Sequence, residues 1–190
     1  MKAKAKAKAK AKQAARKVAK KAAPRNAPRK VAPIPAGYNT VTPYLAIQGA
    51  AAAIDFYKKV FGALELMRMP GPQGKLGHVE IKVGDSKIML ADESEQMNFR
   101  SPKAHGGTPV HIMVYVKDVD ATVAKAIEAG AKMMREVQDM FYGDRTGSIE
   151  DPFGHFWHVS THVRDVTVKE MKRMAEDMAK AAEVAKAAGG

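Results

Sequence analysis

The sequence predicts an α+β protein built from two similar βαβββ modules, with a basic tail before them and a helix after them. The first observation behind this prediction is an internal repeat, in which matching positions lie 69 residues apart. The second is that segments of helical periodicity follow segments in which apolar and polar residues alternate. The third is the distribution of charge, because the formal +12 of the 190-residue chain comes from its first 36 residues.

The repeat aligns the two halves of the body strand by strand. Three pairs of positions define it: Thr42 and His111, Ile47 and Val116, Met89 and His158. We therefore expect modules at about 40–93 and 109–162, together forming one domain over 37–165. Each module is expected to run strand, helix and three strands, and the polar stretch 94–108 links the two.

Each module should hold one amphipathic helix. In the first, an apolar stripe at 3.6-residue spacing consists of Ala50, Ile54, Tyr57 and Phe61, and Gly62 follows its end. In the second, the stripe is Val119, Val123 and Ile127, and Gly130 ends the helix. Asp118 or Asp120 is a suitable N-cap, because a short carboxylate can accept from the free amides of the first turn.

Strand alternation predicts which side chains share a face of each sheet. On the strand that opens the second module, Val110, Ile112, Val114 and Val116 should lie under the helix. His111, Met113 and Tyr115 then share the opposite face. On the last strand, His158 lies on the face of Phe156, Ser160 and His162, so His158 and His111 can face one cavity.

A C-terminal amphipathic helix is expected over 166–190. Thr167 and Glu170 have the spacing of a capping box, in which each side chain accepts from the other's backbone amide. The apolar stripe of this helix consists of Val168, Met171, Met174 and Met178. We expect it to pack on the body or on a second subunit.

The N-terminal tail, residues 1–36, holds 13 Lys and Arg residues and no acid, leaving a body with 19 basic and 20 acidic residues. Repulsion among like charges and a lack of large apolar groups predict disorder. Its composition resembles linker-histone tails, which predicts nonspecific contact with nucleic acid through counterion release. A solvated tail without a partner and a mitochondrial transit peptide are the alternatives, although the absence of Ser disfavours the second. The expected contact residues are Lys2, Lys4, Lys6, Lys8, Lys10, Lys12, Arg16, Lys17, Lys20 and Lys21.

Composition also excludes several classes of protein. Without cysteine the chain has no disulfides, no thiol nucleophile and no zinc–thiolate site. No apolar run is long enough to span a membrane, and the start lacks the apolar region of a secretory signal. We therefore expect a cytoplasmic protein without a membrane partner, associated with the nucleoid if its tail binds DNA.

Several short motifs of the body resemble the vicinal oxygen chelate superfamily, which includes glyoxalase I, bleomycin-resistance proteins and extradiol dioxygenases. Within it the chain is most similar to the PhnB-like group. The resemblance covers about residues 40–170. Its strongest motifs are Gly143-Asp144-Arg145-Thr146-Gly147 and Asp151-Pro152-Phe153-Gly154-His155-Phe156-Trp157. Further matches are Pro43-Tyr44-Leu45, Ala52–Tyr57, Phe61-Gly62-Ala63, Gly77-His78-Val79-Glu80, Asp118-Val119-Asp120 and Gly130-Ala131.

The resemblance implies a fold in which each sheet curls into a half-barrel around a pocket, and a homodimer. In metal-dependent members the first and last strands of each module supply the ligands, which here transfers to Thr42, Met89, His111 and His158. Thr and Met are poor ligands for Ni, Zn, Mn or Fe. Glu80 could complete a site with the two histidines if its strand face meets the pocket. Otherwise His111 and His158 are neutral, hydrogen-bonded pocket residues.

The other predicted pocket residues surround these positions. They are Thr42, Tyr44, His78, Met89, Met113, Tyr115, Arg145, Phe156 and His162. Arg145 could bind an anionic ligand group through its guanidinium fork, or pair with an acid such as Glu150. His155 is expected to be a structural hydrogen-bond donor, and Asp144 a turn residue.

Two functions remain open at this point. A divalent metal on His111, His158 and Glu80 would make the chain a lyase, isomerase or related enzyme acting on a small substrate with adjacent oxygens. A metal-free pocket would instead bind an amphipathic, antibiotic-type small molecule. The loss of ligands at Thr42 and Met89 favours the second function, and the tail could tether either form to nucleic acid.

Overall fold

The computed structural model describes residues 31–188, and the body begins at Gly37. Most of the predicted basic tail, including all of its expected nucleic-acid contacts, therefore lies outside the described residues. Residues 31–36 form no helix or strand. Within the described range no helix is both long and apolar enough to cross a membrane.

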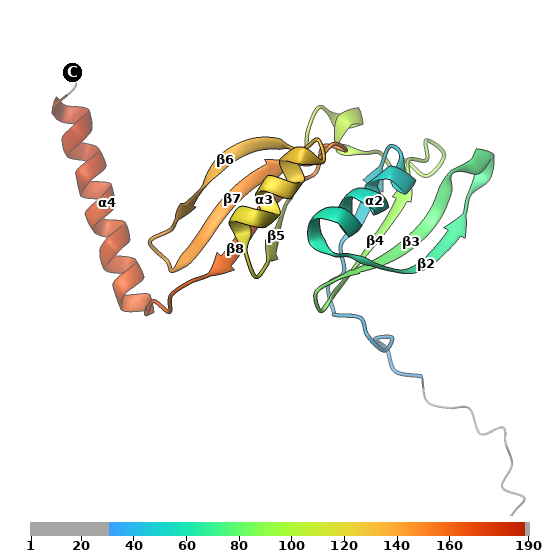
Figure 1. Ribbon diagram of the computed structural model, residues 1–190, viewed down its shortest axis with the longest axis horizontal. Helices are drawn as coiled ribbons and strands as arrows, with labels where there is room; N and C mark the ends of the chain where they lie inside the picture. The colour runs from blue at the N-terminus through green and yellow to red at the C-terminus, as the bar shows by residue number, and fades with distance from the viewer. Residues whose placement is uncertain (1–30, 189–190) are drawn as a thin grey trace, which may run out of the picture. The chain divides into compact units, whose positions relative to one another are not determined.

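The body consists of two four-stranded sheets with one helix each, as Figure 1 shows. The first module comprises β1 (Tyr44–Ile47), α2 (Ala50–Phe61), β2 (Leu64–Pro70), β3 (Leu76–Val83) and β4 (Ser86–Asp92). The second comprises β5 (His111–Tyr115), α3 (Val119–Glu128), β6 (Lys132–Asp139), β7 (Asp144–Glu150) and β8 (Phe156–His162). The predicted pair of βαβββ modules is confirmed.

Both sheets have the same topology. Their strand orders are β1-β4-β3-β2 and β5-β8-β7-β6. The first strand of each module pairs in parallel with its last strand, and the remaining pairs are antiparallel. The 69-residue repeat thus reflects two copies of one supersecondary unit, in which the first and last strands lie side by side.

The helix ends follow the local signals. Asp118 caps α3, because its carboxylate accepts from the Ala121 amide at 2.9 Å. Gly62 follows α2 with φ +65°, a left-handed conformation that favours glycine. Ahead of α4 (Val168–Ala188), Thr167 and Glu170 exchange the predicted capping-box hydrogen bonds.

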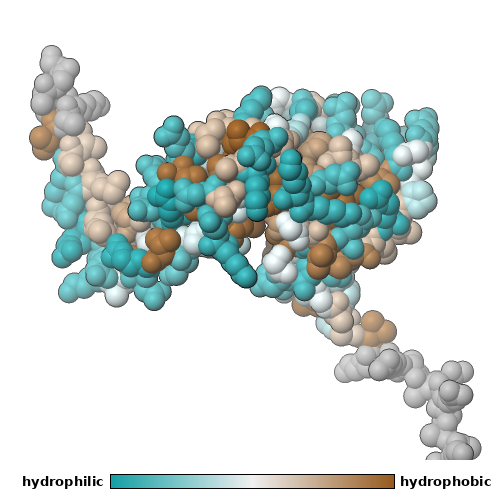
Figure 2. All heavy atoms as spheres, in the orientation of Figure 1, coloured by the Kyte–Doolittle hydropathy of each residue, from teal (hydrophilic) through white to brown (hydrophobic). Residues whose placement is uncertain are grey.

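Each sheet has one face covered by its helix, and the core lies there. Both helices also pack against each other. The predicted stripe of α2 is buried except at its end, and Ile112 and Val114 pack on the core as their strand parity predicts. Figure 2 shows hydrophilic side chains over the outer surfaces of α2 and α3, with hydrophobic patches between them.

One buried carboxylate links the two modules. Asp151 Oδ2 accepts from the Tyr57 hydroxyl on α2 at 2.8 Å and from the Trp157 indole on β8 at 2.9 Å. Its Oδ1 accepts from the backbone amides of Phe153 and His155, both at 2.9 Å. The Asp-Pro-Phe-Gly-His-Phe-Trp motif therefore forms the polar centre of an aromatic core shared by both modules.

Four boundaries or faces differ from the predictions. Val110, expected under α3, precedes β5 and is 66% exposed. β1 begins at Tyr44 rather than Thr42, because Pro43 has no amide and only its carbonyl joins the ladder, accepting from Met89 at 2.9 Å. β5 ends at Tyr115, one residue before Val116. Ile127, expected in the buried stripe of α3, is 38% exposed, since it lies in the last turn beyond the edge of the sheet.

Candidate functional site

The face of each sheet opposite its helix, called here the helix-free face, carries most of the predicted site residues. In the second module the pairs Met113–His158 and Ser148–His158 are neighbours across strands, so their side chains share this face. In the first module, Met89 is the cross-strand neighbour of both Tyr44 and Glu80, so these three side chains also share a face. Many of these side chains are polar or exposed, whereas those on the helix-covered faces are buried.

His111 and His158 meet on the helix-free face of the second module, as predicted. His111 Nδ1 lies 3.1 Å from His158 Nε2, and His158 Nδ1 lies 2.8 Å from the buried Ser148 hydroxyl. The ring of Phe156 stacks on His111 at 4.0 Å between centroids. The three polar side chains form one hydrogen-bonded chain that ends at the exposed His111.

The surroundings of the histidine pair are positively charged. Burial, the neighbouring His111 and the Arg135 guanidinium lower the pKa of His158. Arg135 pairs with Ser148 across β6 and β7, and its Nε is buried without a hydrogen-bond partner among the described residues. His158 is therefore neutral at physiological pH, beside a fixed cation.

Glu80 has no hydrogen bond to either histidine. Its partners come from the first module and from the segment before β1. Its carboxylate accepts from the Tyr38 hydroxyl and, at 3.1 Å, from the Lys87 ammonium. The hydrogen bond from Tyr38 is the main cause of the lowered pKa of Glu80. Lys87 in turn lies 3.8 Å from the centre of the Tyr38 ring, so the carboxylate is enclosed by its own partners.

The metal site predicted from His111, His158 and Glu80 is not assembled within one chain. Over residues 31–188, no three His, Asp or Glu side chains lie close enough together to hold an ion. Thr42 donates to the Asn39 carbonyl at 3.3 Å. Typical catalytic zinc sites need three protein ligands, so the two histidines of one chain do not fit a divalent metal on their own.

A second polar cluster lies at the far end of β7 and β8. Asp144 accepts from the Tyr115 hydroxyl at 2.8 Å, and its other oxygen lies 2.7 Å from His162 Nδ1. Hydrogen bonds with Asp144 and Asp165 raise the pKa of His162. Asp144, expected to be only a turn residue, is 4% exposed and joins two of the predicted pocket residues.

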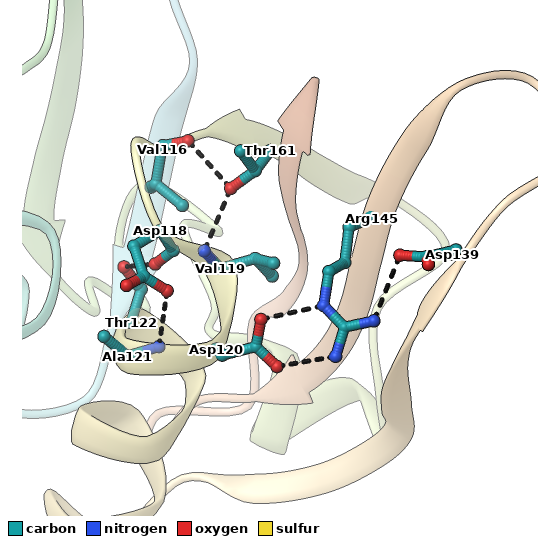
Figure 3. A network of polar contacts seen from close by, with 9 residues as sticks. All are labelled: Val116, Asp118, Val119, Asp120, Ala121, Thr122, Asp139, Arg145 and Thr161. Atoms are coloured by element: carbon teal, nitrogen blue, oxygen red, sulfur yellow. Dashed lines mark hydrogen bonds and ion pairs between the residues drawn. The ribbon is translucent and has the colours of Figure 1, made fainter. Parts of the chain in front are cut away.

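Arg145 does not belong to the pocket. Figure 3 shows its guanidinium beside α3, where Nε and Nη2 donate to both oxygens of Asp120 at 2.8 Å. A third hydrogen bond of 3.0 Å goes to Asp139. Strand parity explains this, because Arg145 points to the helix-covered side with Gly147 and Ile149. The alternative prediction, that Arg145 pairs with an acidic side chain, is confirmed. The partners are Asp120 and Asp139 rather than Glu150.

A groove of about 1150 Å³ is lined by residues of β1, of β5 and of the stretch 98–110 between the modules. We call it the inter-module groove. Tyr44 and Phe99 lie on its wall with ring centroids 5.0 Å apart. His111 and Met113 line the other side, and His155 lies at its base. His155 Nε2 is 3.2 Å from the Ala46 carbonyl, which can only accept, so His155 is the structural donor that the sequence predicts.

Sequence reasoning missed the loop residues of the groove and Arg135. Phe99 and Arg100 lie in the stretch that was predicted only to link the modules, although an aromatic residue beside Arg in a polar loop is a usable signal. Arg135 lies between two register shifts of β6, so simple alternation could not assign its face.

The fold and the cluster of residues on its helix-free faces define a glyoxalase-like protein. The model of the Glyoxalase/Bleomycin resistance protein/Dioxygenase superfamily matches residues 38–159. The chain belongs to this superfamily, and the predicted resemblance is confirmed.

Individual relatives agree with this assignment. "Uncharacterized protein Mb0911c" of Mycobacterium bovis is 43% identical over 135 residues, which are 70% of this chain and 89% of the relative. The crystal structure of TioX from Micromonospora sp. ML1 has a TM-score of 0.51 and 26% identity, covering 68% of this chain and all of TioX. A PhnB protein from Bacillus cereus shares the fold, with a TM-score of 0.53, 15% identity and coverage of 65% and 99%.

Proposed function

We propose that this protein binds an amphipathic small molecule in the inter-module groove and does so without a resident divalent metal. The observation that carries the proposal is the groove itself, lined by aromatic and aliphatic side chains from both modules. Its volume of about 1150 Å³ lies just above the usual range of pockets that hold small organic ligands, so such a ligand fits within it. The superfamily's description includes bleomycin resistance proteins, so an antibiotic-type molecule belongs to the proposed ligand class.

The donor set supports a metal-free site. Among the predicted ligands, His111 and His158 lie within hydrogen-bond distance of each other, and Arg135 raises the cost of placing a cation beside them. Glu80 already has two hydrogen-bond donors of its own. Neutral, hydrogen-bonded histidines are suited to orienting a polar ligand group.

A divalent-metal lyase or isomerase is the second candidate, and one distance favours it. Two nitrogens that bind the same tetrahedral zinc ion at its usual bond lengths lie about 3.3 Å apart. The facing nitrogens of His111 and His158 have a separation of 3.1 Å, and Ser148 supports the second ring from behind. Such an ion would supply Lewis-acid chemistry for an oxyanion.

Titration with N-phenyl-1-naphthylamine, a neutral aromatic amine that fluoresces in apolar surroundings, tests the proposal on the full chain. We expect saturable binding that EDTA leaves unchanged. Phe99→Ala should weaken it about fivefold, because the variant removes an aromatic wall. Met178→Ala, an exposed position on α4, is the matched control and should have no effect. Absence of saturable binding, or binding that EDTA abolishes, would contradict the proposal.

A further inference from the structure

The walls of the inter-module groove have an unbalanced charge. Of the residues that line it, Arg100 is cationic and three are histidines, namely His105, His111 and His155, whereas none is Asp or Glu. The body as a whole is near neutral, so the absence of acidic side chains is particular to this groove. A positive wall beside aromatic rings is suited to a ligand that combines an anionic group with an apolar ring.

From this we infer that the ligand of the groove is an aromatic or similarly apolar anion, such as a carboxylate or sulfonate, held by Arg100 and His111. The inference rests on the proposed function, because it assigns the ligand class of the same groove. It goes further in naming the charge of the ligand and the side chains that recognise that charge.

Arg100 is available for such a contact. Arg68 and Arg145 each pair with carboxylates on their own module. Arg100 is exposed, and within the part of the chain that the structure describes it has no carboxylate within 4 Å. The neighbouring Glu93 accepts from the Ser101 amide at 2.8 Å, and hydrogen bonds from Ser101 are the main cause of its lowered pKa, to which the charges of Lys75 and Arg100 add less. The guanidinium fork is thus free for a ligand anion.

The histidine chain provides a second donor. If the Ser148 hydroxyl donates to His158, then His158 Nε2–H donates to His111 Nδ1. His111 must then carry its proton on Nε2, at the end of the chain away from Ser148. An anion in the groove favours this arrangement, because the His111 Nε2–H can donate to it. The positive charge of Arg135 beside His158 also attracts an anion.

The apolar part of the ligand has its own contacts. Tyr44 and Phe99 lie next to each other on the wall, and Met113 faces them from β5. The hydroxyl of Tyr44 is 3.0 Å from His78 Nδ1, and this hydrogen bond helps to hold the ring in place. A cationic ligand could use the same rings but would find no carboxylate in the groove to pair with.

A matched pair of probes tests the charge of the ligand. 1-Anilinonaphthalene-8-sulfonate has the ring system of N-phenyl-1-naphthylamine with one sulfonate added. We expect the full chain to bind the sulfonate about fivefold more tightly than the neutral amine. Arg100→Gln should remove most of this preference, chiefly by weakening the binding of the sulfonate. Arg173→Gln, an equal change of charge on α4, should alter neither affinity.

The outcomes separate this inference from the proposed function. If both probes bind equally and Arg100→Gln affects neither, the ligand is not selected for charge, although the groove still binds small molecules. A preference for the sulfonate that persists in Arg100→Gln would also overturn the inference. The preference would then come from positive charge elsewhere, such as the basic tail, which every variant retains. If neither probe binds in a saturable way, the proposed function itself fails.

Discussion

Asp151 satisfies four hydrogen-bond donors from three parts of the fold. Two belong to side chains of different modules, Tyr57 and Trp157, and two are amides of the turn before β8. Burial, with the Asp151 charge and hydrogen bond, raises the pKa of Tyr57 well above its ordinary value, so the phenol stays a donor. This residue therefore links the two modules through their shared core.

Replacing Asp151 should therefore cost more stability than any single surface contact. We expect Asp151→Ala to lower the free energy of unfolding by about 3 kcal/mol or more, because several buried donors lose their acceptor. Asp151→Asn, which keeps one carbonyl oxygen, should lose less. Urea unfolding followed by Trp157 fluorescence measures both variants. A loss below about 1 kcal/mol for the alanine variant would contradict the proposed link.

Two histidines make the stability depend on pH. Burial lowers the pKa of His155 and of His158 below the ordinary value of 6.5. The fold favours their neutral forms, so their contribution is complete above pH 6.5 and is lost as the pH falls through the folded-state pKa values. His162 acts in the opposite sense, because its pKa is raised and its contribution is lost as the pH rises.

The prediction is a lower melting temperature at pH 5 than at pH 7.5. His155→Gln should reduce this difference, because an amide can donate to the Ala46 carbonyl without gaining a charge. His105→Gln, at the exposed rim of the groove, serves as the control. Equal pH dependence in His155→Gln and the unchanged chain would exclude His155 as a cause.

Single residues also show how far sequence reasoning reached. His111 and His158 could be paired in advance, because alternation along two strands fixes their face. The partners of Arg145 could not be foreseen, since Asp120 comes from a helix whose rotation over the sheet depends on packing. Glu80 was assigned to the correct face, but the side chains that enclose it come from other strands and from the segment before β1.

At the scale of elements, the βαβββ order follows from period and capping signals alone. The matching spacing of the two halves and the helical stripes predicted the order of the elements in both modules, although not the bounds of every strand. The boundaries moved by one or two residues, at Pro43 before β1 and at the end of β5. The groove was not predictable in this way, because it depends on how two modules pack and on the path of the loop between them.

The cap of α3 gives a local test. Asp118→Ala should lower the free energy of unfolding by about 1 kcal/mol, because the Ala121 amide loses its acceptor. Asp118→Asn retains a capping oxygen and should remain close to the unchanged chain. Thermal or urea unfolding distinguishes the two variants. Equal stability of the alanine and asparagine variants would show that the cap contributes nothing.

At the scale of the whole molecule, apolar side chains on the helix-free faces remain exposed. Met69, Met113 and Tyr115 are exposed by 52%, 47% and 61%. Exposed apolar surface is common where a second copy or a ligand binds. The homodimer implied by the family stays a prediction, as do the domain limits and the cytoplasmic location.

The basic tail adds a prediction that is independent of the groove. Residues 1–36 carry all of the excess positive charge, so the full chain should bind duplex DNA without sequence preference. If about six of these cations contact phosphates, the logarithm of affinity falls with that of salt concentration with a slope of about −5. A 37–190 truncation should bind far more weakly in the same gel-shift series. Equal binding by both would rule out the tail as a tether.

The claim that ligand binding needs no resident metal is tested most directly by elemental analysis of the purified chain after dialysis against Zn, Ni or Mn. We predict metal far below one equivalent per chain, unchanged in His111→Ala, because two histidines beside Arg135 lack a third ligand. A stoichiometric amount of metal that survives dialysis in buffer and disappears in His111→Ala would contradict the account and support the metalloenzyme.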